Sequence, residues 1–144
     1  MEVMLDKIKA VVDKNLPLVS NLSNVSALLN ELKDINWCGF YLRREDYLYL
    51  GPFQGEVACS LIPLSKGVCG HAARSKQTIV VPDVALFPGH IACSSFSKSE
   101  IVVPIIKEQT VVAVIDVDAP IYNRFSKKEV MFLGNVADLL KDLF

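Results

Sequence analysis

The segment EIVVPIIKEQTVVAVIDVDAP, residues 100–120, decides the fold class of this 144-residue chain. Residues 100–106 and 110–118 are runs of apolar, largely β-branched side chains, and only the polar KEQ separates them. Such nearly continuous runs are typical of strands that are buried on both faces. The segment therefore predicts two central strands of a sheet whose two faces both need cover.

Further strands are predicted in the chain before this pair. The aromatic-rich runs WCGFYL, residues 37–42, and YLYLGPF, residues 47–53, are separated only by the charged RRED, which is the pattern of an antiparallel hairpin. Shorter strands are predicted at residues 59–64 and 78–83. The glycine-rich stretch between them, residues 67–76, predicts a turn into a short helix.

Helices are predicted at both ends of the chain. Apolar residues recur at three- and four-residue steps over residues 5–12 and 22–32, and Pro17 marks the break between the two stretches. A last helix begins with Ser126 and Glu129, which have the spacing of a capping box. The pattern predicts an α+β fold in one domain over residues 1–144, with helices packed on a largely antiparallel sheet of roughly six strands.

Composition excludes several function classes. The formal net charge is −1 and the basic residues are scattered, so we expect no nucleic-acid partner. The sequence contains neither a signal-peptide core nor an apolar run long enough to span a bilayer, so we expect a cytoplasmic protein that does not bind membranes. The four cysteines show no C-x-x-C or close Cys/His spacing, which argues against a structural zinc site and a thioredoxin-type pair.

The connection at residues 82–99 is longer than most loops and contains Cys93. Its apolar residues predict a loop that is held against the body of the domain, and a held loop presenting a thiol is a candidate site. The alternative is a buried packing cysteine, which is the commoner role of a lone cysteine and applies equally to Cys59 and Cys69.

Two acidic residues end the second central strand. Asp116 and Asp118 are two residues apart, so on a strand they project from one face, where a buried pair would retain a proton or recruit a cation. The alternative is that DVDAP simply begins a turn. Glu100 borders the neighbouring strand at its loop end, so three carboxylates and a thiol share one pocket if these strand ends converge.

The first strand of the predicted hairpin contributes two aromatic residues to one face. Trp37 and Tyr41 are four residues apart, so they are either core residues or a wall facing a small apolar or cationic ligand. His71 and His90 have no partner at metal-ligand spacing, and we assign them no role beyond ordinary hydrogen bonding.

Several segments together resemble the free methionine (R)-sulfoxide reductases, a family of GAF-domain enzymes. The resemblance runs in order from about residue 36 to residue 126, in NWCGFYL, LGPFQGEVACSLIP, KGVCGHAA, VVPDVALFPGHIACSS, SKSEIVVP, AVIDVDAP and NRFS. It implies a GAF fold, with a six-stranded antiparallel sheet and helices on one side. It also implies reduction of the sulfoxide of free L-methionine in its R configuration.

The resemblance also implies roles for particular residues. Cys93 matches the nucleophile, Cys59 the resolving thiol, and Cys69 a second resolving or recycling thiol. The substrate-binding residues that it implies are the carboxylates that bind the ammonium and sulfoxide ends and the aromatic wall around the methyl end: Glu100, Asp116, Asp118, Trp37 and Tyr41. An intramolecular disulfide would be reduced by thioredoxin, without a metal or organic cofactor, and a homodimer would fit the habit of GAF relatives.

The chain departs from the family pattern at three positions. Ser94 stands where an aspartate commonly follows the nucleophile, His71 replaces a small residue, and Cys38 is an additional thiol. The rival function is that of a GAF sensor, which binds a small molecule without turnover, since one fold hosts many functions. The presence of all three family cysteines together with the carboxylates favours the enzyme.

Overall fold

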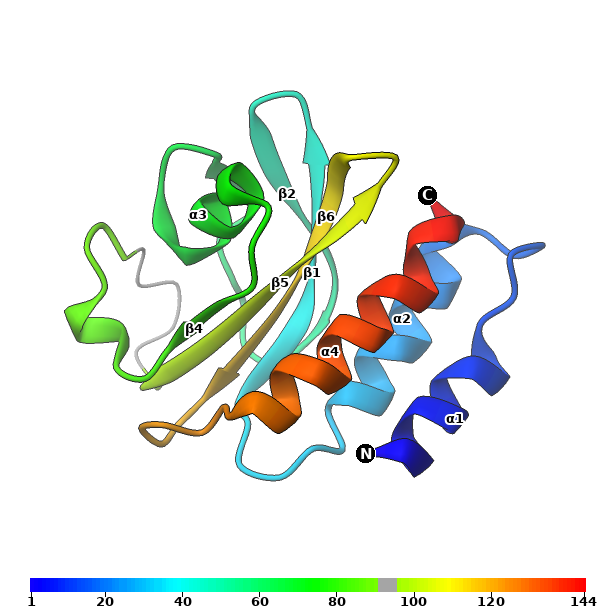
Figure 1. Cartoon of the computed structure of the whole chain (residues 1–144), viewed down its shortest axis with the longest axis horizontal. Coiled ribbons are helices and arrows are strands. Elements are labelled where there is room, and N and C mark those ends of the chain that lie inside the picture. Colours follow the sequence, from blue (N-terminus) through cyan, green and yellow to red (C-terminus); the bar gives the residue numbers. More distant parts are fainter. Residues whose placement is uncertain (91–95) are drawn as a thin grey trace.

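The computed structural model describes residues 1–90 and 96–144, and its centre is a curled six-stranded antiparallel sheet (Figure 1). The strand order across the sheet is β3-β2-β1-β6-β5-β4. The strands are β1 (Trp37–Arg44), β2 (Tyr47–Gln54), β3 (Leu61–Pro63), β4 (Ile79–Val81), β5 (Ser99–Lys107) and β6 (Thr110–Ala119). The two apolar runs at residues 100–106 and 110–118 are thus β5 and β6, and together with β1 they form the middle of the sheet.

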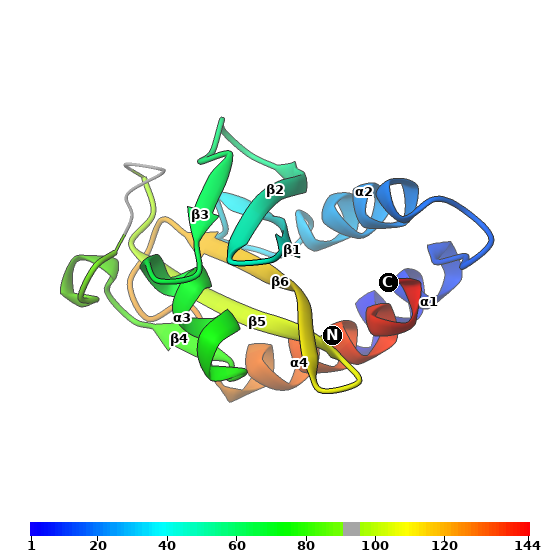
Figure 2. The same cartoon turned by 90° about the horizontal axis from the view of Figure 1, so that it is seen from above.

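Helices cover both faces of this sheet. They are α1 (Glu2–Val11), α2 (Leu18–Leu29), α3 (Gly67–Ser75) and α4 (Lys127–Leu140), and short 3-10 turns follow at Val84–Leu86 and Lys141–Leu143. Figures 1 and 2 show α1, α2 and α4 together on one face, while α3 crosses the opposite face. The sequence resemblance implied helices on one side only, so α3 is a departure from that expectation. Within residues 1–90 and 96–144, no helix combines the length and apolar character that a membrane span requires.

The sheet separates two apolar clusters. Side chains alternate along β1, so Cys38 and Phe40 pack among the residues of α1, α2 and α4, whereas Trp37 and Tyr41 pack under α3. The first cluster is a continuous apolar core, and its largest members are fully buried. The second cluster is smaller and adjoins polar groups. Any chemistry of buried polar groups therefore belongs to the α3 face.

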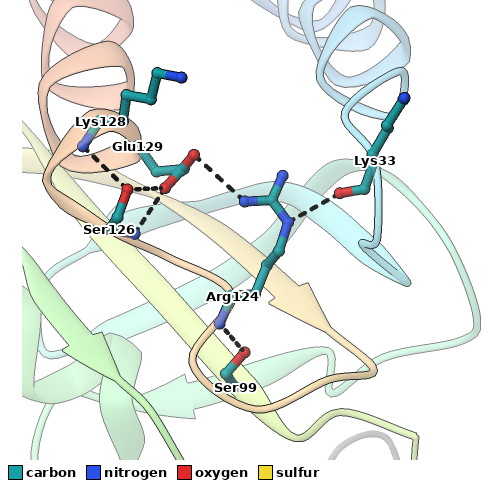
Figure 3. Close-up of polar contacts among 6 residues, drawn as sticks. All are labelled: Lys33, Ser99, Arg124, Ser126, Lys128 and Glu129. Carbon is teal, nitrogen blue, oxygen red and sulfur yellow. Dashed lines mark hydrogen bonds and ion pairs between the residues drawn. The ribbon is translucent and has the colours of Figure 1, made fainter.

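A polar network ties the start of α4 to the end of the sheet (Figure 3). The carboxylate of Glu129 accepts hydrogen bonds from the backbone amide and hydroxyl of Ser126 at 2.6 and 2.7 Å, which confirms the predicted capping box. Arg124 pairs with Glu129 at 3.3 Å and donates from Nε to the Lys33 carbonyl at 3.0 Å. Its backbone amide donates to the hydroxyl of Ser99, the first residue of β5. The network thus fixes the sheet end from which Glu100 and Asp118 project.

We expect Ser126→Ala to lower the free energy of unfolding by about 1 kcal/mol. The substitution removes the acceptor of the Lys128 amide and one donor to Glu129. Denaturant titration measures the effect. The matched control is Lys127→Ala, at the exposed next position, which should change stability by less than about 0.5 kcal/mol. Equal losses in both variants would contradict the capping role.

Candidate active site

Two acidic groups and an aromatic ring form a row across three neighbouring strands. Asp118 of β6 lies opposite Trp37 of β1 on one side and opposite Glu100 of β5 on the other. Paired residues of antiparallel strands share one face of the sheet, so all three side chains lie on the α3 face. The predicted convergence of the strand ends is confirmed. The alternative that DVDAP begins a turn is wrong for both aspartates, because β6 continues to Ala119.

Asp116 lies one row further along β6, between Gly39 of β1 and Val102 of β5. It joins the same face as Asp118, as the spacing of two residues predicts. These carboxyl groups line a cavity of about 40 Å³ under the first turn of α3. Its polar lining consists of Cys69, His90, Ser97, Glu100, Asp116 and Asp118, and its apolar lining includes Trp37, Tyr41, Ile62 and Val68.

Glu100 and Asp116 are buried, Asp118 is half-buried, and all three lack counter-charges among the described residues. Glu100 and Asp116 are each only 6% exposed, and the buried Oδ1 atoms of Asp116 and Asp118 have no hydrogen-bond partner there. Burial, together with the charge of Asp118, raises the pKa of Glu100 to about 8. Burial and the neighbouring carboxyl groups also raise the pKa of Asp116 and Asp118 well above the ordinary range. The cavity therefore retains protons at neutral pH unless a cation enters it.

A free thiol completes this cluster. Cys69 is the third residue of α3, and its Sγ donates to Oδ2 of Asp116 at 3.5 Å. Burial and the nearby carboxylates raise the pKa of this thiol. The thiol that the sequence predicts in the pocket is Cys93. Cys93 and Ser94 lie in residues 91–95, outside the described residues, so its place there stays a prediction. The glycine-rich start of α3 was the available signal for Cys69.

The aromatic wall formed by Trp37 and Tyr41 depends on the glycine that lies between them on the strand, Gly39. Residues 37, 39 and 41 share a face of β1, and because residue 39 is glycine the rings of Trp37 and Tyr41 stack with their centroids 6.0 Å apart. Phe53 lies opposite Gly39 and stacks on Trp37 at 5.3 Å. A Cβ atom at Gly39 would approach Cβ of Phe53 to 2.4 Å. The two rings predicted to share one face therefore form a continuous wall with Phe53.

The same wall holds the segment that carries Cys59. The hydroxyl of Tyr41 donates to the Cys59 carbonyl at 2.9 Å, and the indole nitrogen of Trp37 donates to the Glu56 carbonyl at 3.1 Å. Gly55 has a φ of +135°, and a Cβ atom there would lie 2.6 Å from the Trp37 ring. The chain between β2 and β3 is therefore bound to the aromatic wall at both ends of its path.

The two histidines and Cys38 are separated by the fold. His90 lines the cavity, and its Nε2 lies 3.7 Å from Oε1 of Glu100. Burial lowers the pKa of His90, so the imidazole is neutral at pH 7 and is a hydrogen-bonding group rather than a counter-ion. The sequence offered no signal for this contact beyond the histidine in a long loop. His71 is exposed and meets the edge of Phe87, while Cys38 is buried on the opposite face of the sheet.

We expect the stability of the protein to fall as the pH rises from about 5 to about 8. The pKa of Glu100 is about 8 in the folded protein against 4.5 ordinarily, so the folded state holds a proton that the unfolded chain loses across this window. The slope for one such group is at most about 1.4 kcal/mol per pH unit. Glu100→Gln cannot ionise, so its stability should depend less on pH in denaturant titrations.

The matched control for this series is Glu45→Gln, at an exposed turn between β1 and β2. It should follow the pH dependence of the wild type. A Glu100→Gln variant that loses as much stability with rising pH as the wild type would contradict the buried-proton account.

Comparison with known proteins gives a consistent set of relatives. The family model described as GAF domain matches residues 17–141. A free methionine-R-sulfoxide reductase of Escherichia coli is 47% identical over 127 residues, which cover 87% of this chain and 77% of that protein. A protein of the same name from Saccharomyces cerevisiae is 45% identical over 149 residues, which cover 97% of this chain and 83% of that protein.

A solved structure extends the similarity to three dimensions. The X-ray structure of a free methionine-R-sulfoxide reductase from Neisseria meningitidis, in complex with its substrate, superposes with a TM-score of 0.93 at 41% identity. The superposition covers 99% of this chain and 86% of that one. The similarity therefore includes the elements that build the cavity: β1, β5, β6 and α3.

Proposed function

Because the chain belongs to the free methionine-R-sulfoxide reductase family of GAF-domain proteins, we propose that it reduces free L-methionine (R)-sulfoxide to L-methionine. The observation that carries this proposal is an acidic row, formed by the carboxyl groups of Glu100, Asp116 and Asp118, beside the aromatic wall of Trp37 and Tyr41. A small zwitterion with an apolar tail and a polar sulfoxide needs partners of both kinds in one cavity. Each part of the substrate has a chemically matched group here.

The ammonium group of a free amino acid is the natural partner of the acidic row. Oδ1 of Asp116 and Oδ1 of Asp118 are buried acceptors without donors among the described residues. A buried acceptor left in this state is costly, and an ammonium donor would satisfy it and compensate the charge. A peptide-bound methionine sulfoxide has no ammonium at this position. The acidic row therefore favours the free amino acid over a residue within a protein chain.

The other two parts of the substrate have matched surroundings as well. The first turn of α3 has no capping side chain, and its residues Gly67, Val68 and Cys69 line the cavity. The positive end of the helix dipole there suits a carboxylate. The stacked rings of Trp37 and Tyr41 suit the methyl group, because an apolar tail gains free energy when it leaves water for an aromatic surface.

We propose that Cys93 is the nucleophile, as the family resemblance implies. Its thiolate attacks the sulfoxide sulfur, and the sulfoxide oxygen, once protonated, passes to the cysteine as a sulfenic acid while methionine leaves. The proton comes from the acidic row, whose raised pKa values keep a carboxylic acid available at neutral pH. The oxidised cysteine and the reduced methionine balance the reaction.

We propose that Cys59 then resolves the sulfenic acid. Its thiol condenses with the sulfenic acid to give a disulfide and water, and Cys69 serves as a second resolving or recycling thiol. A dithiol such as thioredoxin returns the disulfide to two thiols and is itself oxidised. The hydrogen bond from Tyr41 to the Cys59 carbonyl supports this role, because it holds the Cys59 segment against the wall of the cavity.

Substrate selectivity tests the proposed function. The protein, coupled to thioredoxin, thioredoxin reductase and NADPH, should reduce free methionine (R)-sulfoxide and should act poorly on the N-acetyl compound, which has no ammonium charge. Asp118→Asn should lower kcat/KM for the free amino acid by at least about 30-fold, equivalent to ~2 kcal/mol. Equal kcat/KM values for the free and acetylated sulfoxides would refute the assignment of the acidic row, and binding without turnover would identify a sensor.

The cysteines should differ in the step that they support. In the absence of reductant, Cys93→Ser should not release even the single equivalent of methionine that the wild type releases. The reason is that a serine hydroxyl is too weakly ionised to attack the sulfoxide. Cys59→Ser should release one equivalent per subunit but lose multiple turnover with thioredoxin. Cys38→Ser, on the far face of the sheet, is the matched control and should behave as the wild type. Methionine released by Cys93→Ser would show that another group is the nucleophile.

A further inference from the structure

The cavity is lined by the thiol of Cys69 and the imidazole of His90 as well as by carboxyl groups, whereas an ammonium group needs only the carboxyl groups as partners. We propose that the cavity also binds a zinc ion through Cys69, Glu100 and Asp116, with His90 beside Glu100 as a supporting group, and that zinc excludes the substrate. The exclusion of substrate rests on the proposed function, whereas the metal site itself does not.

Three donor atoms of the cavity lie close to one another. One donor atom each of Cys69, Glu100 and Asp116 lie within 4.8 Å of one another. Zinc bonds of about 2.0–2.3 Å place neighbouring ligand atoms about 3.3–3.8 Å apart. The Cys69 Sγ to Asp116 Oδ2 distance is 3.5 Å, so this pair already has the separation that zinc requires. The Nε2 atom of His90 lies 3.7 Å from Oε1 of Glu100, close enough to support that ligand.

The donor types select the metal. A thiolate and two carboxylates combine soft and hard ligands, a mixture that suits zinc better than magnesium or calcium, which prefer oxygen alone. A separate observation indicates a cation at this place: Asp116, whose side chain is 94% buried and lines the cavity, has an Oδ1 atom without a donor among the described residues. An ion bound between Cys69 and Glu100 would compensate this carboxylate.

The ligands come from elements that the fold holds in place. Glu100 and Asp116 stand on the adjacent strands β5 and β6, and Cys69 belongs to the first turn of α3. The positive end of a helix stabilises a thiolate there once the metal has displaced the proton. Because the ligands are scattered over residues 69–116, the sequence spacing that normally reveals a zinc site is missing.

Zinc and substrate would compete for the same carboxylate. Asp116 is both a proposed zinc ligand and one of the two aspartates proposed to bind the substrate ammonium, and it cannot hold both cations in a cavity of about 40 Å³. Zinc should therefore raise the KM for methionine sulfoxide and leave kcat unchanged. The KM for methionine sulfoxide would then rise with the concentration of free zinc.

Cobalt(II) substitution tests the metal site without reference to activity. The protein, reduced with a phosphine that is then removed, is titrated with Co²⁺, and we expect a thiolate-to-cobalt absorption band that Zn²⁺ abolishes. Cys69→Ser should lose the band, and Cys38→Ser, whose thiol lies on the opposite face of the sheet, should retain it. His90→Gln should weaken Zn²⁺ binding by at least about tenfold, within the range found for groups that support a metal ligand.

The outcomes separate the two proposals. A band that persists in Cys69→Ser and is lost in Cys59→Ser or Cys93→Ser overturns the site, because other thiols then hold the metal. No band in the wild type overturns it too. An unchanged Zn²⁺ affinity in His90→Gln overturns the supporting role of His90. Inhibition by Zn²⁺ that lowers kcat alone overturns the competition. A cobalt band in a protein without reductase activity would support the metal site and refute only the proposed function.

Discussion

Three carboxyl groups line one cavity, and their mutual repulsion governs what else the α3 face can contain. Two ionised groups a few ångströms apart in a medium of low dielectric repel strongly. The three groups are therefore stable together only when protons or a cation bind to them. Glu100, Asp116 and Asp118 gain no compensating lysine or arginine among the described residues that line the cavity. A bound cation would relieve this repulsion, and the site therefore prefers cations.

The free-energy cost of placing these carboxyl groups together is offset elsewhere in the fold. On the far side of the sheet, α1, α2 and α4 bury a continuous apolar cluster that includes Ile8, Leu22 and Phe40. The network of Arg124, Glu129 and Ser126 then fixes the strand ends, so the acidic groups cannot move apart to reduce their repulsion. The acidic row is held on strands, whereas Cys59 lies on a connecting segment. The groups that keep a fixed spacing stand on strands, and the thiol that we propose exchanges partners stands on the connecting segment.

Much of this arrangement could be predicted from the sequence, because it follows from local periodicity. A period of two determines that Asp116 and Asp118 share a face, and the same rule pairs Trp37 with Tyr41. The strands at the sheet edges were overestimated: residues 59–64 and 78–83 contain only β3 (Leu61–Pro63) and β4 (Ile79–Val81). Pro82 follows β4 directly and has no amide hydrogen to continue the ladder.

The contacts that could not be predicted are those between distant segments. No local rule indicates that α3 crosses the face opposite the other helices, so nothing placed Cys69 against Asp116. The position of His90 beside Glu100 likewise depends on the path of a long loop. Sequence periodicity gives the face on which a residue stands, but the neighbour across the cavity is decided by packing of the whole chain.

The hydrogen bond from Tyr41 to the Cys59 carbonyl has an evolutionary consequence. One side chain both shapes the apolar end of the cavity and tethers the segment of the proposed resolving thiol. A mutation that shortens Tyr41 to admit a bulkier sulfoxide would also release that segment, so under the proposed mechanism substrate range and recycling are not selected independently at this position. Broader specificity is more accessible at Ala58 and Ile62, which line the cavity without holding the tether.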